Sequence, residues 1–366
     1  MKIMFCLGGL EKGGAERVVC NLANYLVKQG NEVALIINSD KNKAYELDSK
    51  IDIKLLDKKN KNKCNFLERN FLRIRNLKKF IINYKPDVIL AFLQEPTARL
   101  LFLKTFDFKI RKIPVIVSVR IDPKVAFKTL KRKLGLMLYK NAEGFVFQTN
   151  EAKTFFKEKI QLRSVVIGNP INPLFFKEDY SFDNTKDKIV SVGRLTQQKN
   201  YPMLLKAFKN VLQEYPKYEL EIYGDGELKD DLKEYTEKLK ITNSVHFMGN
   251  VDDIQSYMMD AKMFIITSNY EGMSNALMEA MAMGLPCIST NSSGGGASTL
   301  IVNGENGILV PKENIDFLTN QILELLSDPD KCKKISNNSK ESMKNYNPEN
   351  INNLWLNYIK RIVGDD

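Results

Sequence analysis

The chain has a single histidine, a single tryptophan and no long uninterrupted apolar run among its 366 residues. His246 lies in a short β-like segment, so neither a histidine-based catalytic triad nor a zinc site is expected. The five cysteines are odd in number, lie far apart and form no C-x-x-C motif, which indicates buried thiols in a reducing cytoplasm. No apolar stretch approaches the roughly 20 residues that cross a bilayer, and residues 2–7 are too few for a secretory signal. We therefore expect a cytoplasmic protein without disulfides or a spanning helix.

Excess positive charge is confined to one half of the chain. Residues 1–180 carry 35 Lys and Arg against 18 Asp and Glu, whereas residues 181–366 carry 20 against 26. The basic residues concentrate at 69–79, 104–112 and 124–140, where large apolar side chains are interleaved. Basic-apolar helices of this kind can lie on an anionic membrane surface, and ordinary solvated helices are an equally good interpretation. No recognition motif accompanies the charge, so we expect no nucleic-acid partner.

The length of the chain exceeds one ordinary core and fits two domains. Strand, glycine-rich turn and helix alternate along it, beginning with a strand at 2–7, a helix at 15–28 and a strand at 32–37. This order predicts right-handed βαβ units and hence parallel sheets. Two prolines in residues 169–173 exclude regular strand pairing there, so we expect the crossing between domains at that point.

Two carboxylates eight positions apart, Glu271 and Glu279, belong to a junction between a strand and a helix. Residues 263–267 predict a buried strand, and residues 273–283 have helical spacing. A helix that begins after a short Glu-Gly loop presents unpaired backbone N–H groups to an anion. At roughly 3.6 residues per turn the two acids are about two turns apart, so both can face one site. The alternative is an amphipathic helix with a capping acid.

Two cations, Arg194 and Lys199, lie in a second loop of the same kind, between a predicted strand at 188–192 and a helix at 201–215. A forked guanidinium and an ammonium there can bind a pyrophosphate. Further strands that end in glycine-containing turns follow at 220–228 and 244–251. Ligands of doubly wound sheets bind beyond the carboxyl ends of the strands, which is where all these motifs lie.

These segments resemble the retaining, nucleotide-sugar-dependent glycosyltransferases of family four, which have the GT-B architecture. The matching stretches, in family order over residues 188–310, are SVGRLTQQKN, IYGDGEL, VHFMGNV, TSNYEGMSNALMEAMAMGLPCIST and NGENGILV; GGLEKGGAERVVCNLANYL matches near the N-terminus. The resemblance implies an α/β fold with two Rossmann-like domains whose parallel sheets face an interdomain cleft. It implies an acceptor-binding domain at 1–170 with a returning helix at about 348–366, and a nucleotide-sugar donor-binding domain at 174–347.

The resemblance also implies roles for individual residues. Arg194 and Lys199 would hold the leaving diphosphate, Glu271 would face the donor sugar, and Glu279 would bind the ribose hydroxyls. The remaining donor-binding candidates are Gly14, Arg120, Gly193, Gly224, Asn250, Gly272, Ser274, Asn275 and Ala276. Thr299 stands where relatives commonly carry an acid, so the contacts of that loop, and the sugar they would select, stay open.

The implied reaction is retaining and metal-independent transfer of a hexose or N-acetylhexosamine. The donor would be a nucleotide sugar, with UDP expected, and the acceptor a polyprenyl-diphosphate-linked or other saccharide in surface polysaccharide or glycan assembly. No cofactor is expected, because the nucleotide sugar is a co-substrate, and the D-P-D at 328–330 reads as a turn and helix cap rather than a metal site. The protein would be peripheral on the inner face of the plasma membrane. A nucleotide-sugar epimerase of the same fold and a non-catalytic sugar-nucleotide-binding subunit are the alternatives.

Overall fold

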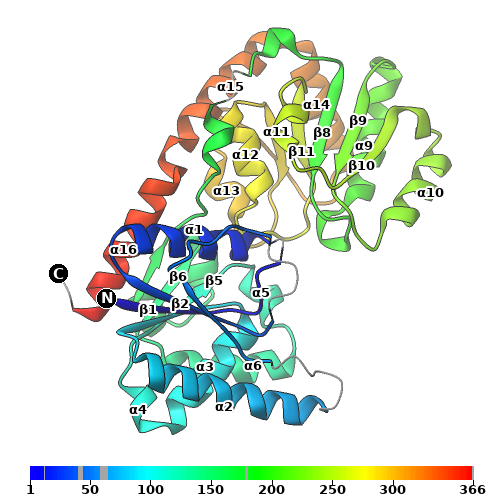
Figure 1. Cartoon of the computed structure of the whole chain (residues 1–366). Coiled ribbons are helices and arrows are strands. Elements are labelled where there is room, and N and C mark those ends of the chain that lie inside the picture. The colour runs from blue at the N-terminus through cyan, green and yellow to red at the C-terminus, as the bar shows by residue number, and fades with distance from the viewer. Residues whose placement is uncertain (12, 40–43, 58–64, 178–179, 365–366) are drawn as a thin grey trace. The chain divides into compact units, whose positions relative to one another are not determined.

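The computed structural model describes residues 1–11, 13–39, 44–57, 65–177 and 180–364 (Figure 1). The chain divides into two compact units, which we call unit 1 (Met1–Pro170 with Glu349–Asp366) and unit 2 (Ile171–Pro348). The sequence predicts 1–170 with about 348–366 for the first and 174–347 for the second. No helix in the described part of the chain is both long enough and apolar enough to span a bilayer.

Unit 1 is built on a seven-stranded sheet in the order β3-β2-β1-β4-β5-β6-β7, in which neighbouring strands are parallel. The strands are β1 (Lys2–Cys6), β2 (Glu32–Ile37), β3 (Asp52–Leu55), β4 (Val88–Phe92), β5 (Val115–Val119), β6 (Gly144–Phe147) and β7 (Ser164–Val166). Strands β4 and β5 are buried at every position. Strands covered on both faces have continuous apolar sequences, which is why these were predictable.

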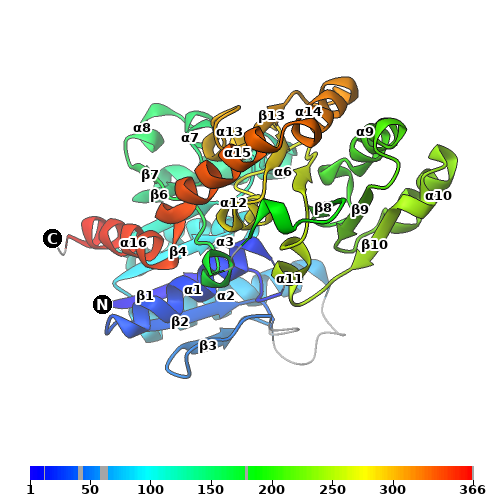
Figure 2. The same cartoon turned by 90° about the horizontal axis from the view of Figure 1, so that it is seen from above.

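Helices cover both faces of this sheet (Figures 1 and 2). α2 (Phe66–Tyr84), α3 (Gln94–Phe106), α4 (Phe108–Arg111) and α6 (Leu130–Met137) lie on one face, and α1 (Gly14–Lys28) and α16 (Pro348–Val363) on the other. The short helices α5 (Pro123–Ala126), α7 (Asn150–Thr154) and α8 (Glu158–Gln161) lie in the connections. α2 begins at a capping box, in which Asn65 and Glu68 each bond the other's backbone N–H group.

The returning helix α16 is part of the core of unit 1. Trp355 is fully buried and its ring stacks on Phe92, with the ring centroids 5.7 Å apart. The Tyr358 hydroxyl accepts a hydrogen bond from the Phe145 backbone N–H at 2.8 Å and donates one to the Arg163 carbonyl at 2.6 Å. Residues distant in sequence are therefore needed to complete this sheet's second face.

Unit 2 contains a six-stranded parallel sheet in the order β10-β9-β8-β11-β12-β13. The strands are β8 (Lys188–Val192), β9 (Glu219–Tyr223), β10 (Val245–Gly249), β11 (Met263–Ile266), β12 (Cys287–Thr290) and β13 (Ile308–Val310). The helices are α9 (Tyr201–Glu214), α10 (Lys229–Leu239), α11 (Ile254–Met258), α12 (Asn275–Met283), α13 (Gly296–Leu300), α14 (Ile315–Ser327) and α15 (Pro329–Met343). Because β9 and β11 lie on opposite sides of β8, the order of strands reverses there, which is where doubly wound sheets bind ligands.

Alternate side chains of the central strands of unit 2 enter two separate cores. Ile189 and Ile265 pack with α9, α10 and α14, whereas Val190 and Phe264 pack with α12 and α13. The sheet is thus covered on both faces, and the carboxyl ends of its strands, with their loops, remain for other contacts.

The structure can be compared with three expectations from the sequence: the basic stretch 124–140, the D-P-D motif and the cysteines. The basic stretch 124–140 does not form one helix: it is divided among α5, α6 and the 3₁₀ turn η2 (Leu138–Asn141). The D-P-D motif is a helix cap, as expected, since the Asp328 carboxylate accepts a bond from the Lys331 N–H at 2.9 Å. Four of the five cysteines are buried free thiols (Cys6, Cys20, Cys287 and Cys332), while Cys64 lies outside the described residues.

Candidate functional site

The loop that follows β8 is held in place by its own neighbours. The Gly193 N–H bonds the carbonyl of Tyr223 at 2.9 Å, and the buried Tyr201 hydroxyl donates to the Gly193 carbonyl at 3.0 Å. Asn200 adopts the left-handed conformation (φ 47°) and starts α9. Burial raises the pKa of Tyr201, and the charge of Glu271 adds to this effect, so Tyr201 stays a neutral donor.

Lys199 and Glu271 form an ion pair at the carboxyl ends of β8 and β11. The Lys199 Nζ lies 2.6 Å from the Glu271 Oε2, and the two side chains are only 12% and 19% exposed. The same carboxylate accepts bonds from the Ser268 hydroxyl at 3.1 Å and the Gln198 amide at 3.3 Å. Such limited solvent access strengthens the attraction between the charges relative to water. The acid is therefore fixed by three donors from two loops.

The two loops are also joined by backbone and side-chain hydrogen bonds. The Thr267 hydroxyl donates to the Lys199 carbonyl at 3.0 Å, and the Asn269 N–H donates to the Gln198 carbonyl at 2.8 Å. Asn200 and Asn269 share a further side-chain bond at 3.1 Å. The loops after β8 and β11 consequently form one rigid platform.

Arg194 lies on the same platform, but unlike Lys199 it is not paired with an acid among the described residues. Its side chain is exposed, and its guanidinium has no hydrogen-bond or ion-pair partner within the described part of the chain. A guanidinium with all five N–H groups accessible can bind a phosphate in a bidentate manner. Arg194 is thus a cation available to a ligand, whereas Lys199 is already shared with an acid.

The predicted glycines serve the packing of these loops. A Cβ on Gly193 would lie 3.0 Å from the Lys199 Cε, and one on Gly224, where φ is +129°, would lie 2.1 Å from the Gly193 carbonyl oxygen. The Gly224 N–H bonds the carbonyl of Gly249 at 2.7 Å, and the exposed Asn250 follows at the end of β10. The approach of backbone at Gly224 excludes a side chain there, whereas a side chain on Gly193 would crowd Lys199.

The start of α12 forms another side of the site. Ser274 is the N-cap and accepts a bond from the Leu277 N–H at 3.5 Å, and Asn275 and Ala276 begin the helix. The preceding Gly272 lies against the start of α13, because a Cβ on Gly296 would be 1.7 Å from the Gly272 carbonyl oxygen. First-turn N–H groups at this end favour an anion.

Glu279 differs from Glu271 in its surroundings. It lies in the middle of α12 and is only 8% exposed. The structure therefore brings Lys199 and Glu271 into contact, places Arg194 on the same loop as Lys199, and buries Glu279 within the adjoining helix.

Two predicted donor-binding residues, Gly14 and Arg120, belong to unit 1. Gly14 is the first residue of α1 and is exposed. Arg120 follows β5; its Nε donates to the Ser118 hydroxyl at 2.8 Å and its Nη1 to the Asn169 side chain at 3.0 Å. Its guanidinium lies over the rings of Phe92 and Trp355, at 5.7 and 5.3 Å from their centroids.

The Arg120 cation has no counter-ion among the residues that the structure describes. Its buried Nη2 has no hydrogen-bond partner among the described residues. Burial lowers the pKa of Arg120 to about 9, with no neighbouring charge contributing. Gln148, which sequence reasoning did not identify, donates to the same Asn169 oxygen at 2.8 Å. A polar group with acceptor atoms would complete this cluster.

Sequence reasoning also missed Gln198 and Ser268, although both lie inside recognised motifs. Each acts on Glu271, and for Gln198 the partner is 73 positions away along the chain. The only available signal was their place at strand ends, which identifies a site but not its hydrogen bonds.

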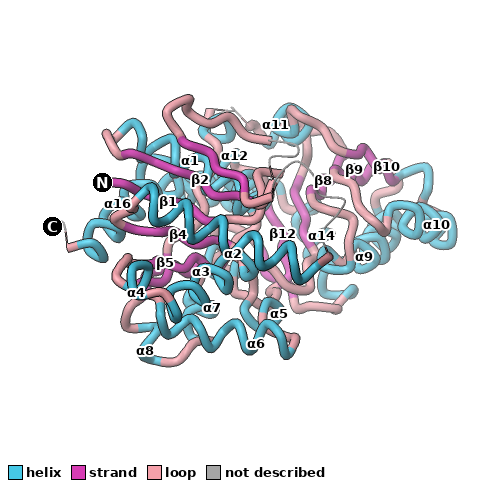
Figure 3. Tube along the Cα trace, turned by 60° about the horizontal axis from the view of Figure 1, so that its bottom comes forward, coloured by secondary structure: helices cyan, strands magenta, loops and turns pink. Residues whose placement is uncertain are grey.

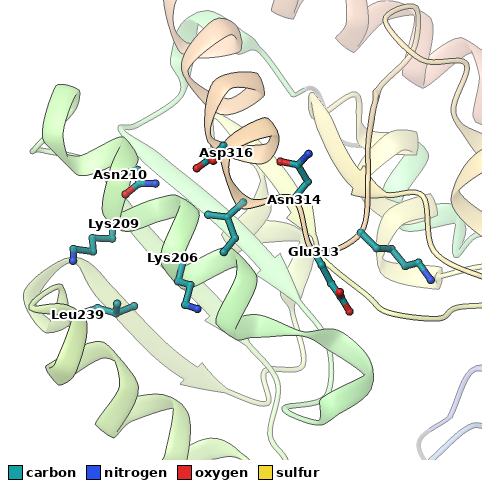
Figure 4. A pocket seen from close by; sticks show the side chains of 9 residues that line it. Lys206, Lys209, Asn210, Leu239, Glu313, Asn314 and Asp316 are labelled. Carbon is teal, nitrogen blue, oxygen red and sulfur yellow. The ribbon is translucent and has the colours of Figure 1, made fainter.

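An open hollow of about 700 Å³ lies elsewhere on unit 2, between α9 and the start of α14 (Figure 4). Its lining combines three exposed lysines with two exposed acids: Lys206, Lys209, Lys312, Glu313 and Asp316. None of the predicted site residues lines it. We therefore do not assign the site to this hollow.

Comparison with known proteins covers most of the chain. The model of Glycosyltransferase Family 4 matches residues 12–174, and that of Glycosyl transferases group 1 matches residues 174–342. The "GalNAc-alpha-(1->4)-GalNAc-alpha-(1->3)-diNAcBac-PP-undecaprenol alpha-1,4-N-acetyl-D-galactosaminyltransferase" of Campylobacter jejuni is 27% identical over 99% of both chains. The amylovoran biosynthesis glycosyltransferase AmsD of Erwinia amylovora is 27% identical over 97% of this chain and 98% of its own.

Solved structures agree on the architecture. HepE of Anabaena in complex with UDP superposes with a TM-score of 0.81 at 19% identity, over 99% of this chain and all of its own. At this identity the likeness concerns the fold, and it extends over both α/β units. The chain therefore belongs to glycosyltransferase family four and has the two-domain GT-B architecture.

Proposed function

We propose that the protein is a retaining glycosyltransferase that moves a hexose or N-acetylhexosamine from a UDP-sugar to a polyprenyl-diphosphate-linked saccharide in surface polysaccharide or glycan assembly. The observation that carries the proposal is the Lys199–Glu271 ion pair on the platform that also bears Arg194, whose guanidinium has no partner among the described residues. Two relatives support it further: the Campylobacter jejuni enzyme is named for an undecaprenol-linked acceptor, and HepE was solved with UDP.

The charges of the platform suit a departing diphosphate. Arg194 offers a planar fork of donors, and Lys199 supplies a second cation at the same strand end. Because Glu271 holds Lys199 at 2.6 Å, the diphosphate shares this cation with the carboxylate. The first-turn N–H groups of α12 add positive potential where negative charge develops. In this proposal Arg and Lys neutralise the diphosphate, so no metal ion and no cofactor takes part.

The proposed reaction is a front-face displacement. The acceptor hydroxyl oxygen forms a bond to the anomeric carbon while the bond from that carbon to the β-phosphate oxygen breaks. The hydroxyl proton passes to the leaving phosphate, and the nucleoside diphosphate departs. Attack on the face that the phosphate leaves retains the anomeric configuration. Glu271, fixed by three donors, stabilises the positive charge of the sugar ring in the transition state.

The test is a panel of radiolabelled UDP-, GDP- and ADP-sugars, each with and without a polyprenyl-diphosphate-linked saccharide. The proposal expects release of nucleoside diphosphate only when the acceptor is present, an α-linked product from an α-linked donor, and activity that persists in EDTA. An epimerised donor without acceptor would instead identify an epimerase. Donor binding without any turnover across the panel would favour a non-catalytic binding subunit.

A further inference from the structure

Large apolar side chains are exposed on the helical layer of unit 1 that contains α3, α4 and α6. Six of them are between 44% and 78% exposed: Phe102, Phe106, Phe108, Leu130, Leu134 and Met137. Single exposed apolar residues are ordinary, but a group of six on adjoining helices marks an interaction surface. Figure 3 brings this layer of helices forward.

The six side chains belong to neighbouring stripes. A Cβ on Gly135 of α6 would lie 3.6 Å from the Ala98 Cβ of α3, and the Asn141 amide donates to the Thr105 hydroxyl at 2.8 Å. α6 and the turn after it therefore run beside α3 in the same direction. Phe102 and Phe106 follow Ala98 at intervals of four residues, so they share its side of α3, and their ring centroids are 4.8 Å apart.

In α6 the same spacing aligns Leu130, Leu134 and Met137 along one stripe. Phe108 extends the α3 stripe into α4, where the Arg111 guanidinium lies 5.2 Å from its ring centroid. We call the surface made by the six apolar side chains the α3–α6 face.

Cations border the α3–α6 face. Lys128, Arg132 and Lys133 lie before and within α6, and Lys109 and Arg111 lie in α4; all five are exposed. Residues 124–140 contain six Lys and Arg and no Asp or Glu. Lys128, Arg132 and Lys133 have no ion-pair partner in the part of the chain that the structure describes. Their charge is therefore available to an external anionic partner.

We propose that the α3–α6 face binds the headgroup region of an anionic lipid bilayer. Apolar side chains inserted beneath the headgroups, with a rim of Lys and Arg among anionic lipids, are the two signals that together give stable membrane binding. A nucleic acid could bind the cations through its phosphates and stack its bases on the phenylalanines. It would not stack on Leu130, Leu134 and Met137, because these side chains lack an aromatic face. The combination of aliphatic stripe and unpaired cations thus favours lipid.

This inference goes beyond the proposed function and can be tested without donor or acceptor. The full chain is sedimented with vesicles of phosphatidylglycerol and phosphatidylethanolamine, and with vesicles of phosphatidylcholine alone. Binding is expected only to the anionic vesicles and should weaken as salt increases. Arg132→Glu with Lys133→Glu should reduce the partition coefficient by at least about tenfold, since each cation near the surface contributes about fivefold. Leu134→Glu with Met137→Glu should reduce it by at least about tenfold as well.

Matched controls change exposed residues of the same chemical kinds in unit 2. Val302→Glu with Phe317→Glu replaces exposed apolar side chains, and Lys209→Glu with Lys217→Glu reverses exposed charges. Both controls should bind anionic vesicles nearly as well as the wild type. A cooperative thermal unfolding transition at the wild-type temperature verifies that each variant is folded.

Two results would overturn the proposal. One is the absence of sedimentation with anionic vesicles. The other is binding that depends on Arg132 and Lys133 but not on Leu134 and Met137, which would describe a surface recognised by charge alone; retardation of duplex RNA in a gel would then identify a nucleic acid. Failure of the proposed function is separable, because Lys199→Met should still sediment with vesicles even if no sugar is ever transferred.

Discussion

The Lys199 ammonium is already partly neutralised by Glu271. Removing this ammonium should therefore weaken, but not abolish, binding of the donor diphosphate. Lys199→Met takes away a charge-assisted contact to the donor diphosphate, worth about 1.5–3 kcal/mol, so the affinity for UDP should fall at least about tenfold. Titration calorimetry with UDP measures this directly. The control is Lys206→Met, an exposed lysine in α9 that lines the hollow of Figure 4. Equal UDP affinity in both variants would contradict the assignment of Lys199.

Glu271→Gln should have the opposite effect on binding. The amide keeps the volume of the side chain but releases Lys199 from its carboxylate, so UDP should bind at least as tightly as to the wild type. Transfer should nevertheless slow by about 100-fold or more, because the charge near the sugar ring is lost. Comparing kcat with the UDP dissociation constant separates the two roles. A variant that keeps the wild-type kcat would show that Glu271 only positions Lys199.

Asp260 links the starts of β8 and β11, the two strands that lead to the platform. Burial raises its pKa, but hydrogen bonds from Lys186 and Lys188 outweigh this and hold the pKa below its ordinary value of 3.8. Lys188 is itself buried and also bonds the Tyr257 carbonyl at 3.0 Å and Glu221 at 3.2 Å. The charged form of Asp260 therefore stabilises the folded state.

The contribution of Asp260 to the free energy of unfolding should decrease at acid pH. A carboxyl whose pKa is lowered by folding contributes stability above its unfolded pKa and loses it as the pH falls through its folded pKa. Asp260→Asn should thus lower the free energy of unfolding by about 2 kcal/mol at pH 7. The difference from the wild type should shrink below pH 3.8. Urea unfolding of both proteins across this range measures it, and a pH-independent difference would refute the explanation.

At the scale of elements, the start of α13 and the loop before it determine where the Glu271 loop lies. The Glu271 N–H bonds the Ser293 carbonyl at 2.9 Å, and a Cβ on Gly296 would lie 1.7 Å from the Gly272 carbonyl oxygen. Gly296→Ala must therefore displace the segment that carries Glu271. We expect a loss of about 1–3 kcal/mol in stability and a larger proportional loss of transfer activity.

Gly135→Ala is the matched control for this substitution, because its Cβ would meet the Ala98 Cβ at an ordinary 3.6 Å. Its stability and activity should stay close to those of the wild type. Chemical denaturation and the transfer assay, applied to both variants, compare the two glycines. Full activity of Gly296→Ala would show that the Glu271 loop tolerates the displacement.

Elements were predictable wherever apolar spacing alone decides them. The buried strands of both sheets and the start of α2 at Asn65 follow from local sequence. The division of 124–140 does not, because it depends on Phe127, whose buried ring packs edge-on against Tyr139 at 5.5 Å and Phe156 at 6.1 Å. Drawing this ring into the core turns the chain between α5 and α6, and local helix propensity does not register such packing against Tyr139 and Phe156.

In the candidate site, too, local sequence predicts the position of residues but not their long-range hydrogen bonds. Spacing placed Arg194, Lys199 and Glu271 in loops after predicted strands, and parallel strands present such loops at one edge. The role of these residues in binding a donor stays a prediction. The pairing of Lys199 with Glu271, and the support from Gln198 and Ser268, connect loops about 70 positions apart. The geometry of such bonds is set by the sheet as a whole.

At the scale of the whole molecule, unit 1 depends on a helix that follows unit 2 in the chain. Trp355→Ala should remove about 3–5 kcal/mol of stability, because it leaves a large cavity against Phe92. We expect calorimetry to show the transition of unit 1 about 10 °C lower, with the transition that UDP shifts unchanged. Leu354→Ala, its half-exposed neighbour, should alter stability by no more than about 0.5 kcal/mol. Equal effects of the two substitutions would contradict the assignment of α16 to the core.

The return of α16 has a consequence for synthesis on the ribosome. Unit 2 is continuous in sequence, so it can fold while the chain is still growing, whereas unit 1 must wait for residues that are translated only after unit 2. At roughly 5–20 residues per second, the surface around Phe92 stays uncovered for roughly ten seconds or longer. A nascent chain interrupted before residue 349 would therefore contain a complete unit 2 and a unit 1 whose apolar surface around Phe92 is still uncovered.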